Sequence, residues 1–284
     1  MSEVGEVHVW WTSLDPAAPA PEILAQAISG DERARAERFR FDRDRLRFVA
    51  GRGILRVILG RYLRRRPSSL RLRYGPAGKP TLALEAGEED IRFNVSHAGG
   101  LGLYAVTRGR EIGADVERIV PAFALDDMVE RCLTSREAAA LRALDPEVRL
   151  AAFFRCWTRK EAYLKARGHG LTASLRSVEV SVGDAGSAAV PGLVGDPADA
   201  SRWSLLDLSP GAGSVAAVAV EGRRPRVVRR DMSCVGCHGL EPADHGQGRF
   251  GDDVATFALD LRPDDSPGPG ARIVVGHQLV SLAD

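Results

Sequence analysis

The chain of 284 residues is 44% hydrophobic and 27% charged, a composition typical of a soluble globular protein with one large domain or two smaller ones. No apolar stretch approaches the roughly 20 residues that cross a bilayer, and the acidic start of the chain lacks the basic region of a secretory signal. Four cysteines in a chain of this length make no disulfide framework, so we expect a cytoplasmic protein without a membrane span.

Charge is distributed unevenly along a chain whose net charge is +1. Residues 228–284 carry five arginines and nine acidic residues, a local balance of −4, so the rest of the chain carries +5. The arginine-rich stretch 33–56 favours phosphates or an acidic partner, although a solvated helix surface would have the same pattern.

Lysine is rare in this sequence, which has 36 arginines but only Lys79, Lys160 and Lys165. Lysine offers a compact charge on a flexible stem, whereas arginine offers a rigid planar fork. The three lysines therefore indicate places where arginine will not serve, and two of them lie in one short segment.

The first half of the chain predicts helices followed by strands. An edge strand is expected at 6–11, and helices at 21–28, 31–39 and 43–63, the last with an amphipathic spacing. Period-two patterns then predict strands at 70–74, 91–95, 101–107 and 112–117. The four-residue connection between the last two favours a β-hairpin.

The second half repeats this order. Helices are predicted at 126–132, from Thr134 with Glu137 as capping-box partner, and at 147–167, and strands at 177–182, 203–208 and 215–220. The strand–turn–strand segments 93–106 and 203–220 have similar patterns, which we interpret as a duplication of two α+β halves. Past Arg230 glycine, aspartate and proline prevail, and we expect a poorly ordered tail.

Asp115 and Glu117 lie two residues apart on a predicted strand, so both carboxylates point to one face. Adjacent carboxylates repel each other unless a cation lies between them, and hard oxygen ligands with room for waters suit Mg²⁺. Taken alone, the pair is also compatible with an exposed acidic strand end.

Glu161 interrupts the apolar stripe of the longest predicted helix. The stripe consists of Leu150, Phe153, Phe154, Trp157 and Leu164. A buried carboxylate is costly unless it is paired or coordinates a metal, and Lys165 lies one turn further along the same face. These features favour an internal site over a salt bridge on a helix surface.

Ser96 and His97 end a predicted strand just before two glycines. Neighbours in an extended segment point to opposite faces, so the two cannot act as nucleophile and base. A hydroxyl and an imidazole at this place suit phosphate oxygens, and Lys79 adds a cation on a turn between glycine and proline. Each motif is ambiguous on its own.

Together, these motifs resemble those of phosphopantetheinyl transferases. G-A-D-V-E-R at 113–118 and F-F-R-C-W-T-R-K-E-A-Y-L-K at 153–165 resemble the family's signature pair, above all in the long, pseudo-duplicated type that serves polyketide and nonribosomal peptide synthetases. G-K-P at 78–80, F-N-V-S-H at 93–97 and the arginine-rich segment 38–52 match in order and spacing. The resemblance covers about residues 5–227.

The resemblance implies an α+β fold of two similar halves in a pseudo-twofold arrangement. We place the first half, on the coenzyme A side, at 1–115, the second at 116–227, and the acidic tail at 228–284. The implied reaction transfers 4′-phosphopantetheine from coenzyme A to a serine of an acyl or peptidyl carrier protein and releases adenosine 3′,5′-bisphosphate. The expected partners of this monomeric enzyme are coenzyme A and a carrier protein with an acidic surface, without nucleic acid or membrane.

Residue by residue, the resemblance implies that Asp115, Glu117 and Glu161 surround Mg²⁺. Glu161 also matches the family's candidate general base, and Lys165 would hold a phosphate oxygen of coenzyme A. The further implied phosphate contacts come from Lys79, Ser96, His97 and Arg43, with Arg47 and Arg52 as alternatives in the same arginine-rich segment. Lys160 is expected to be structural or to face the carrier.

Two other functions use the same residues. A Mg²⁺-dependent phosphohydrolase acting on a nucleotide would also need three carboxylates and a lysine. A carrier-binding or coenzyme-A-binding module without catalysis is the non-enzymatic alternative, although every ionisable group of the site is present.

The tail contains Cys234-Val-Gly-Cys237-His238, which formally matches a c-type haem attachment motif. The two cysteines could also hold zinc with two of the histidines His238, His245 and His277. Because no export signal accompanies the motif, we interpret it as a chance match in a disordered extension.

Overall fold

The structure, a computed structural model, describes residues 5–15, 21–76, 78–84, 87, 89–121, 123, 125–168, 174–183, 192–193, 196–223, 225–230, 272–275 and 278–281. The tail motif at 234–238, together with His245 and His277, lies outside the described residues. None of the helices in the described ranges is long and apolar enough to cross a membrane.

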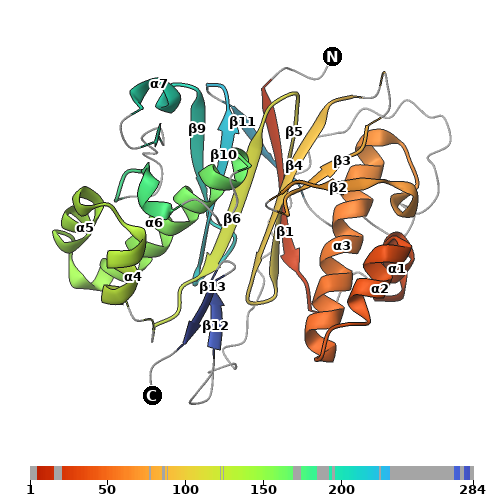
Figure 1. The fold of residues 1–284 in the computed structure, drawn as a ribbon, viewed down its shortest axis with the longest axis horizontal. Helices are drawn as coiled ribbons and strands as arrows, with labels where there is room; N and C mark the ends of the chain where they lie inside the picture. The colour runs from red at the N-terminus through yellow and green to blue at the C-terminus, as the bar shows by residue number, and fades with distance from the viewer. Residues whose placement is uncertain are drawn as a thin grey trace.

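Two β-sheets pack face to face, and a group of helices covers the outer side of each (Figure 1). The first sheet has the order β11-β1-β5-β4, from β11 (Arg226–Arg229), β1 (Glu6–Ser13), β5 (Leu101–Arg108) and β4 (Ile91–Ala98). The second has the order β6-β10-β9, from β6 (Ile112–Arg118), β10 (Ser214–Glu221) and β9 (Trp203–Leu208). The predicted α+β class is confirmed.

The two halves repeat one arrangement. Each begins with a strand, continues with three helices, and ends with an antiparallel pair whose last strand lies between the other two. The helices are α1 (Pro21–Ala27), α2 (Gly30–Ala36) and α3 (Asp42–Leu63) in the first half, and α4 (Leu125–Cys132), α5 (Ser135–Arg142) and α6 (Pro146–Ala166) in the second. The duplication inferred from segments 93–106 and 203–220 is confirmed, since these fall on the paired strands β4–β5 and β9–β10.

Short elements complete the chain. They are η1 (Pro67–Ser69), β2 (Leu72–Tyr74), β3 (Pro80–Leu82), η3 (Leu175–Ser177), β7 (Val178–Glu179), β8 (Gly192–Leu193) and α7 (Pro197–Ala200). Within the tail, β12 (Arg272–Val275) and β13 (Gln278–Ser281) pair as an antiparallel hairpin, while residues 231–271 lie outside the described part.

The predicted hairpin between 101–107 and 112–117 is wrong. β5 pairs with β1 and β4, whereas β6 pairs with β10, so residues 109–111 carry the chain from one sheet to the other. Both strands are buried on their two faces, which requires a sheet on one side and helices on the other. Because β6 belongs to the second sheet from Ile112 onward, we propose that the halves divide at 109–111.

The prediction that β1 is an edge strand is also wrong. β11 pairs in parallel with β1, on the side away from β5, with Glu6 opposite Arg226. The last strand of the second half therefore completes the sheet of the first half.

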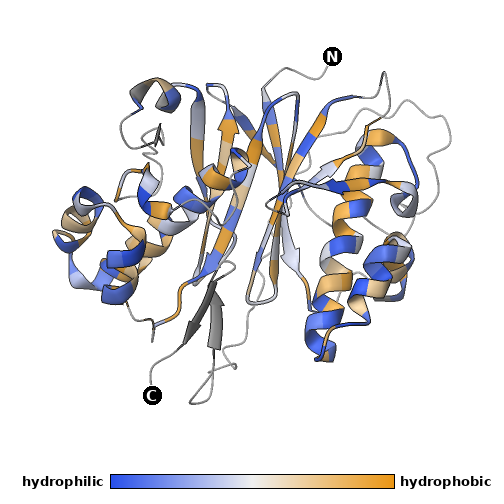
Figure 2. Cartoon of the chain, in the orientation of Figure 1, coloured by the Kyte–Doolittle hydropathy of each residue, from blue (hydrophilic) through white to orange (hydrophobic). Residues whose placement is uncertain are grey.

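Apolar side chains fill three layers, between the two sheets and between each sheet and its helices. Hydrophobic residues are frequent along the strands and alternate with hydrophilic ones along the helices (Figure 2). On β6, Ile112, Ala114 and Val116 pack between the sheets, which leaves Asp115 and Glu117 on the face toward α6. The predicted common face of these two carboxylates is confirmed.

Gly113 lets β6 and α6 approach each other closely. A Cβ at this position would lie 2.0 Å from the carbonyl oxygen of Ala162 and 2.3 Å from the amide nitrogen of Ala166. Any side chain would therefore collide with helix backbone, which cannot yield without moving α6 away from the sheet. This contact holds the strand that carries Asp115 against the helix that carries Glu161.

We expect Gly113→Ala to lower the free energy of unfolding by about 3 kcal/mol or more, the upper part of the range for overpacked interiors. Urea unfolding measures the loss. Gly30→Ala is the matched control, because apart from its chain neighbours and its own helix backbone no atom of the described residues lies within 4 Å of a Cβ built at Gly30. Equal stability of the two variants would contradict the close approach.

Candidate active site

Ser96, Asp115 and Lys165 form a polar contact where β4, β6 and α6 meet. The Lys165 Nζ donates to Asp115 Oδ1 over 2.5 Å and to Ser96 Oγ over 3.2 Å. The Ser96 hydroxyl donates to the same Asp115 oxygen over 2.9 Å. Ser96 belongs to the first half and the other two to the second, so the contact lies at the junction of the halves.

Asp115 is fully buried, and its two carboxylate oxygens differ in their surroundings. Oδ1 accepts from both Lys165 and Ser96. Oδ2 is buried and has no hydrogen-bond partner among the described residues. A buried acceptor without a partner is costly, which indicates that this oxygen is kept for a group outside the chain.

Glu161 and Lys165 face the same carboxylate from α6. Burial, followed by the nearby charge of Asp115, raises the pKa of Glu161 to about 7, although Lys165 acts in the opposite direction. Burial disfavours the charged form of Lys165, but Asp115, Glu161 and Glu117 outweigh it and raise the pKa of the ammonium above its usual value. Lys165 is therefore charged at neutral pH among acidic groups.

The acidic groups suit Mg²⁺ by their chemistry. Mg²⁺ prefers oxygen ligands and is often held by one or two carboxylates, with waters and substrate phosphates completing its shell. Asp115 offers an oxygen that accepts no hydrogen bond from the described part of the chain, and Glu161 is buried beside it. Within the described ranges, however, no three Asp, Glu, His or Cys side chains are close enough together to hold a metal. The full set that includes Glu117 therefore stays a prediction.

Arg47 and His97 each lie near the turn between β4 and β5. Arg47 pairs with Asp15 over 2.7 Å, and its guanidinium lies 2.9 Å from a Cβ built at Gly100. His97, on the strand just before this turn, is exposed. Arg43 lies four residues before Arg47 on α3 and is largely exposed.

Two more arginines bear on the predicted phosphate contacts. Arg118 lies against the same turn, since its Cδ would be 2.2 Å from a Cβ at Gly99. The motif analysis missed Arg118, although it is the last residue of G-A-D-V-E-R. The guanidinium of Arg52 lies over the rings of Phe48 and Tyr74.

Lys79 lies on the connection between β2 and β3, and its ammonium reaches the C-terminal end of α6. Its Nζ donates to the carbonyls of Ile112 and Ala166 over 3.0 and 3.3 Å, and to Glu111 over 3.3 Å. An ammonium at this helix end interacts favourably with the helix dipole. These contacts give Lys79 a structural role, and its role as a phosphate ligand stays a prediction.

Asn94 is a second residue that sequence reasoning missed. Its buried side-chain oxygen accepts from the backbone N–H of Ala114 over 2.9 Å. It thereby joins β4 and β6, which lie at the edges of different sheets. A buried amide between apolar strand residues was the available signal.

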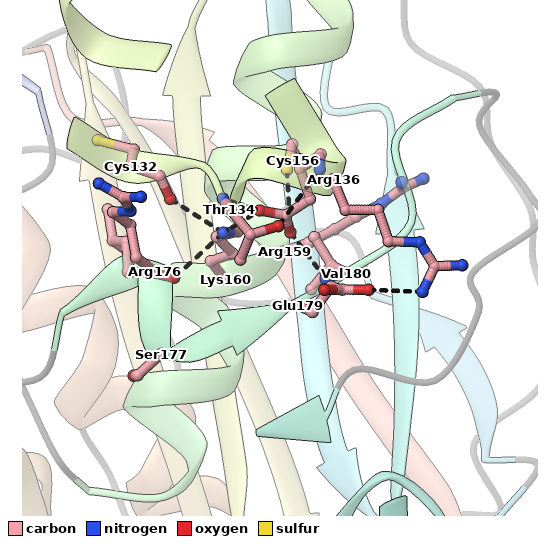
Figure 3. A network of polar contacts seen from close by, with 12 residues as sticks. Cys132, Thr134, Arg136, Cys156, Arg159, Lys160, Arg176, Ser177, Glu179 and Val180 are labelled. Carbon is pink, nitrogen blue, oxygen red and sulfur yellow. Dashed lines mark hydrogen bonds and ion pairs between the residues drawn. The ribbon is translucent and has the colours of Figure 1, made fainter. Parts of the chain in front are cut away.

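Lys160 is structural, and its complete burial excludes the alternative that it faces the carrier. Its Nζ donates to the carbonyl of Cys132 over 2.9 Å (Figure 3). It also donates to the carbonyl of Leu175 over 3.1 Å and forms an ion pair with Glu137. These contacts tie α6 to the end of α4 and to η3.

Glu137 accepts several hydrogen bonds in the same network. The backbone N–H groups of Thr134 and Val180 donate to it over 2.7 and 2.8 Å. The contact with Thr134 is reciprocal, which confirms the predicted capping box. The network fixes α5 against the helix that carries the site.

We expect Lys160→Met to lower the free energy of unfolding by about 3–5 kcal/mol, because it leaves Glu137 as an unpaired buried carboxylate. Adding Glu137→Gln removes that charge and should restore part of the stability. Urea unfolding of the single and double variants measures both effects. A double variant no more stable than Lys160→Met would show that charge pairing is not the cause.

The stability of the metal-free protein should depend on Glu161 and on pH. A folded-state pKa near 7, above the ordinary 4.5, means that stability is lost as pH rises through this window. Glu161→Gln should therefore be more stable than the unsubstituted protein at pH 8 in EDTA, by on the order of 3 kcal/mol. This gain in stability should vanish near pH 4.5. A stability difference between the two proteins that does not change with pH would contradict the raised pKa of Glu161.

Two family models match successive parts of the chain. The model "4′-phosphopantetheinyl transferase, N-terminal" matches residues 12–108, and the model "4′-phosphopantetheinyl transferase superfamily" matches residues 111–219. Their limits fall on either side of the connection between β5 and β6.

Among curated proteins, the chain is 43% identical over 217 residues to the 4′-phosphopantetheinyl transferase HetI of Nostoc sp., covering 76% of this chain and 88% of the relative. It is 33% identical to a putative 4′-phosphopantetheinyl transferase of Synechocystis sp., covering 70% and 78%. The holo-[acyl-carrier-protein] synthase structure of Thermotoga maritima aligns over 40% of this chain and 64% of its own, with 22% identity and a TM-score of 0.31. On the family models and the Nostoc relative, the chain belongs to the 4′-phosphopantetheinyl transferase superfamily, as an enzyme of the long type with two similar halves.

Proposed function

We propose that this transferase moves 4′-phosphopantetheine from coenzyme A to a serine of an acyl or peptidyl carrier protein, with Mg²⁺, in the cytoplasm and as a monomer. The observation that carries the proposal is the charged Lys165 among buried carboxylates, beside an Asp115 oxygen that has no hydrogen-bond partner among the described residues. Family membership supports the reaction class, and the positive charge of the chain outside its tail supports an acidic partner.

The bonds follow from the chemistry of a diphosphate. The serine oxygen forms a bond to the phosphorus that carries pantetheine, and the bond from that phosphorus to the bridging oxygen breaks. Adenosine 3′,5′-bisphosphate leaves with the bridging oxygen. Mg²⁺ held by Asp115 and Glu161, with Glu117 as the third proposed ligand, would neutralise charge on the diphosphate.

Glu161 is suited to accept the serine proton, because a carboxylate with a pKa near 7 is a stronger base than an ordinary one and is still ionised in part at neutral pH. Lys165 is suited to stabilise the phosphate charge that develops on the leaving side, because its ammonium is charged and fixed in position.

The nucleotide end of coenzyme A would lie along the turn between β4 and β5. Arg47 on α3 and His97 on β4 flank this turn, and Arg43 lies four residues before Arg47 on α3. Lys79 is the remaining proposed contact; its ammonium lies beside the C-terminal end of α6 and the start of β6, away from this turn. These cations suit the phosphates of the adenosine part.

Incubation with coenzyme A and Mg²⁺, with and without an apo carrier protein, tests the reaction. We expect adenosine bisphosphate release only with the carrier, together with the mass gain of the carrier. Release that ignores the carrier would favour the nucleotide phosphohydrolase.

Glu161→Gln should reduce transfer at least about 100-fold, the usual contribution of a general base, and remain folded. Glu147→Gln is the matched control, since Glu147 is exposed in the first turn of the same helix. Initial rates of carrier modification measure both variants. Transfer by Glu161→Gln at the rate of the control would remove Glu161 from the mechanism.

A further inference from the structure

Ser96 was expected to hold a phosphate oxygen of coenzyme A, but its hydroxyl is buried and faces Asp115. A serine hydroxyl has one proton to donate, and this proton goes to Asp115 Oδ1. Lys165 donates into the same hydroxyl oxygen. A phosphate oxygen is itself an acceptor, so Ser96 could bind it only by giving up the bond to Asp115.

The two contacts on Oδ1 fix the rotation of the Asp115 carboxylate. With Oδ1 held by Ser96 and Lys165 from two different elements, Oδ2 is the oxygen without a partner among the described residues. Asn94, two residues before Ser96 on the same face of β4, bonds to the backbone of Ala114. This bond sets the position of β4 against β6, and thus of Ser96 against Asp115.

We propose that Ser96 is a positioning residue for a divalent cation: its hydroxyl orients Asp115 so that Oδ2 is the ligand oxygen. The inference rests on the proposed function, which places the cation at Asp115. Partners that orient metal-ligating carboxylates commonly contribute 10- to 100-fold to metal affinity, on the order expected here.

Mn²⁺ alone, titrated into the full chain and followed by electron paramagnetic resonance, measures this role without coenzyme A or carrier. We expect Ser96→Ala to raise the Mn²⁺ dissociation constant about tenfold or more. The same variant should bind adenosine 3′,5′-bisphosphate in EDTA within about twofold of the unsubstituted protein, since less than about 0.4 kcal/mol would be lost.

Ser96→Thr and Ser96→Val form a matched pair, because they share one shape and differ in the hydroxyl. Thr should bind Mn²⁺ more tightly than Val by about tenfold. Because the two side chains have the same shape, their comparison isolates the effect of the hydroxyl on Mn²⁺ affinity, even if the alanine variant does not fold. His97→Ala, at an exposed neighbour on the opposite face, should leave Mn²⁺ affinity unchanged and weaken bisphosphate binding.

Equal Mn²⁺ affinity of the Thr and Val variants would overturn the inference. So would a loss of bisphosphate affinity in Ser96→Ala that matches His97→Ala, because Ser96 would then be a phosphate contact. Absence of Mn²⁺ binding by the unsubstituted protein would overturn it together with the proposed metal. Transfer to a carrier by the unsubstituted protein is measured separately, so failure of the transferase reaction is distinguishable from failure of Ser96.

Discussion

The contact on which the site depends is the close approach of β6 to α6 at Gly113. The strand and the helix meet backbone to backbone there, at Ala162 and Ala166. Asp115 follows Gly113 by one alternation of the strand, and Glu161 and Lys165 lie within one turn of the contact on the helix. A longer side chain at 113 would separate the two elements and with them the carboxylates and the ammonium. The distance between the acidic groups of β6 and α6 therefore depends on the absence of a side chain at Gly113.

Two lysines on α6, the buried Lys160 and the partly buried Lys165, show how the same group can support a structure or serve a reaction. Lys160 is enclosed by a carboxylate and two carbonyls of neighbouring elements, so its charge is satisfied within the protein. Lys165 contacts Ser96 and Asp115, and the adjacent Asp115 oxygen has no partner in the described part of the chain. The first arrangement stabilises the fold. The second keeps charge concentrated where burial makes electrostatic interactions strong.

Much of this arrangement could be predicted from the sequence, because it depends on local periodicity. Alternation placed Asp115 and Glu117 on one face, and the interrupted apolar stripe identified Glu161. Which strands pair with one another could not be predicted from local sequence, because the pattern of β5 and β6 suits a hairpin as well as it suits two separate sheets. The contact of Ser96 with Asp115 was missed for the same reason, since 19 positions separate residues that meet only after the two sheets pack. Side-chain type suggested phosphate binding, whereas tertiary contact determines what the hydroxyl faces.

The parallel pairing of β11 with β1 has a consequence for how the chain reaches this structure. Glu6 and Arg226 lie opposite each other and form an ion pair of 3.0 Å, although they are 220 positions apart. The finished first sheet has four strands. During synthesis, however, it lacks β11 until nearly all of the transferase region has been made. Until then β1 presents an unpaired edge, and unpaired edges are templates for association with other chains. Pairing over so long a span is also slow. The first sheet is therefore complete only after β11 has been synthesised and has paired with β1.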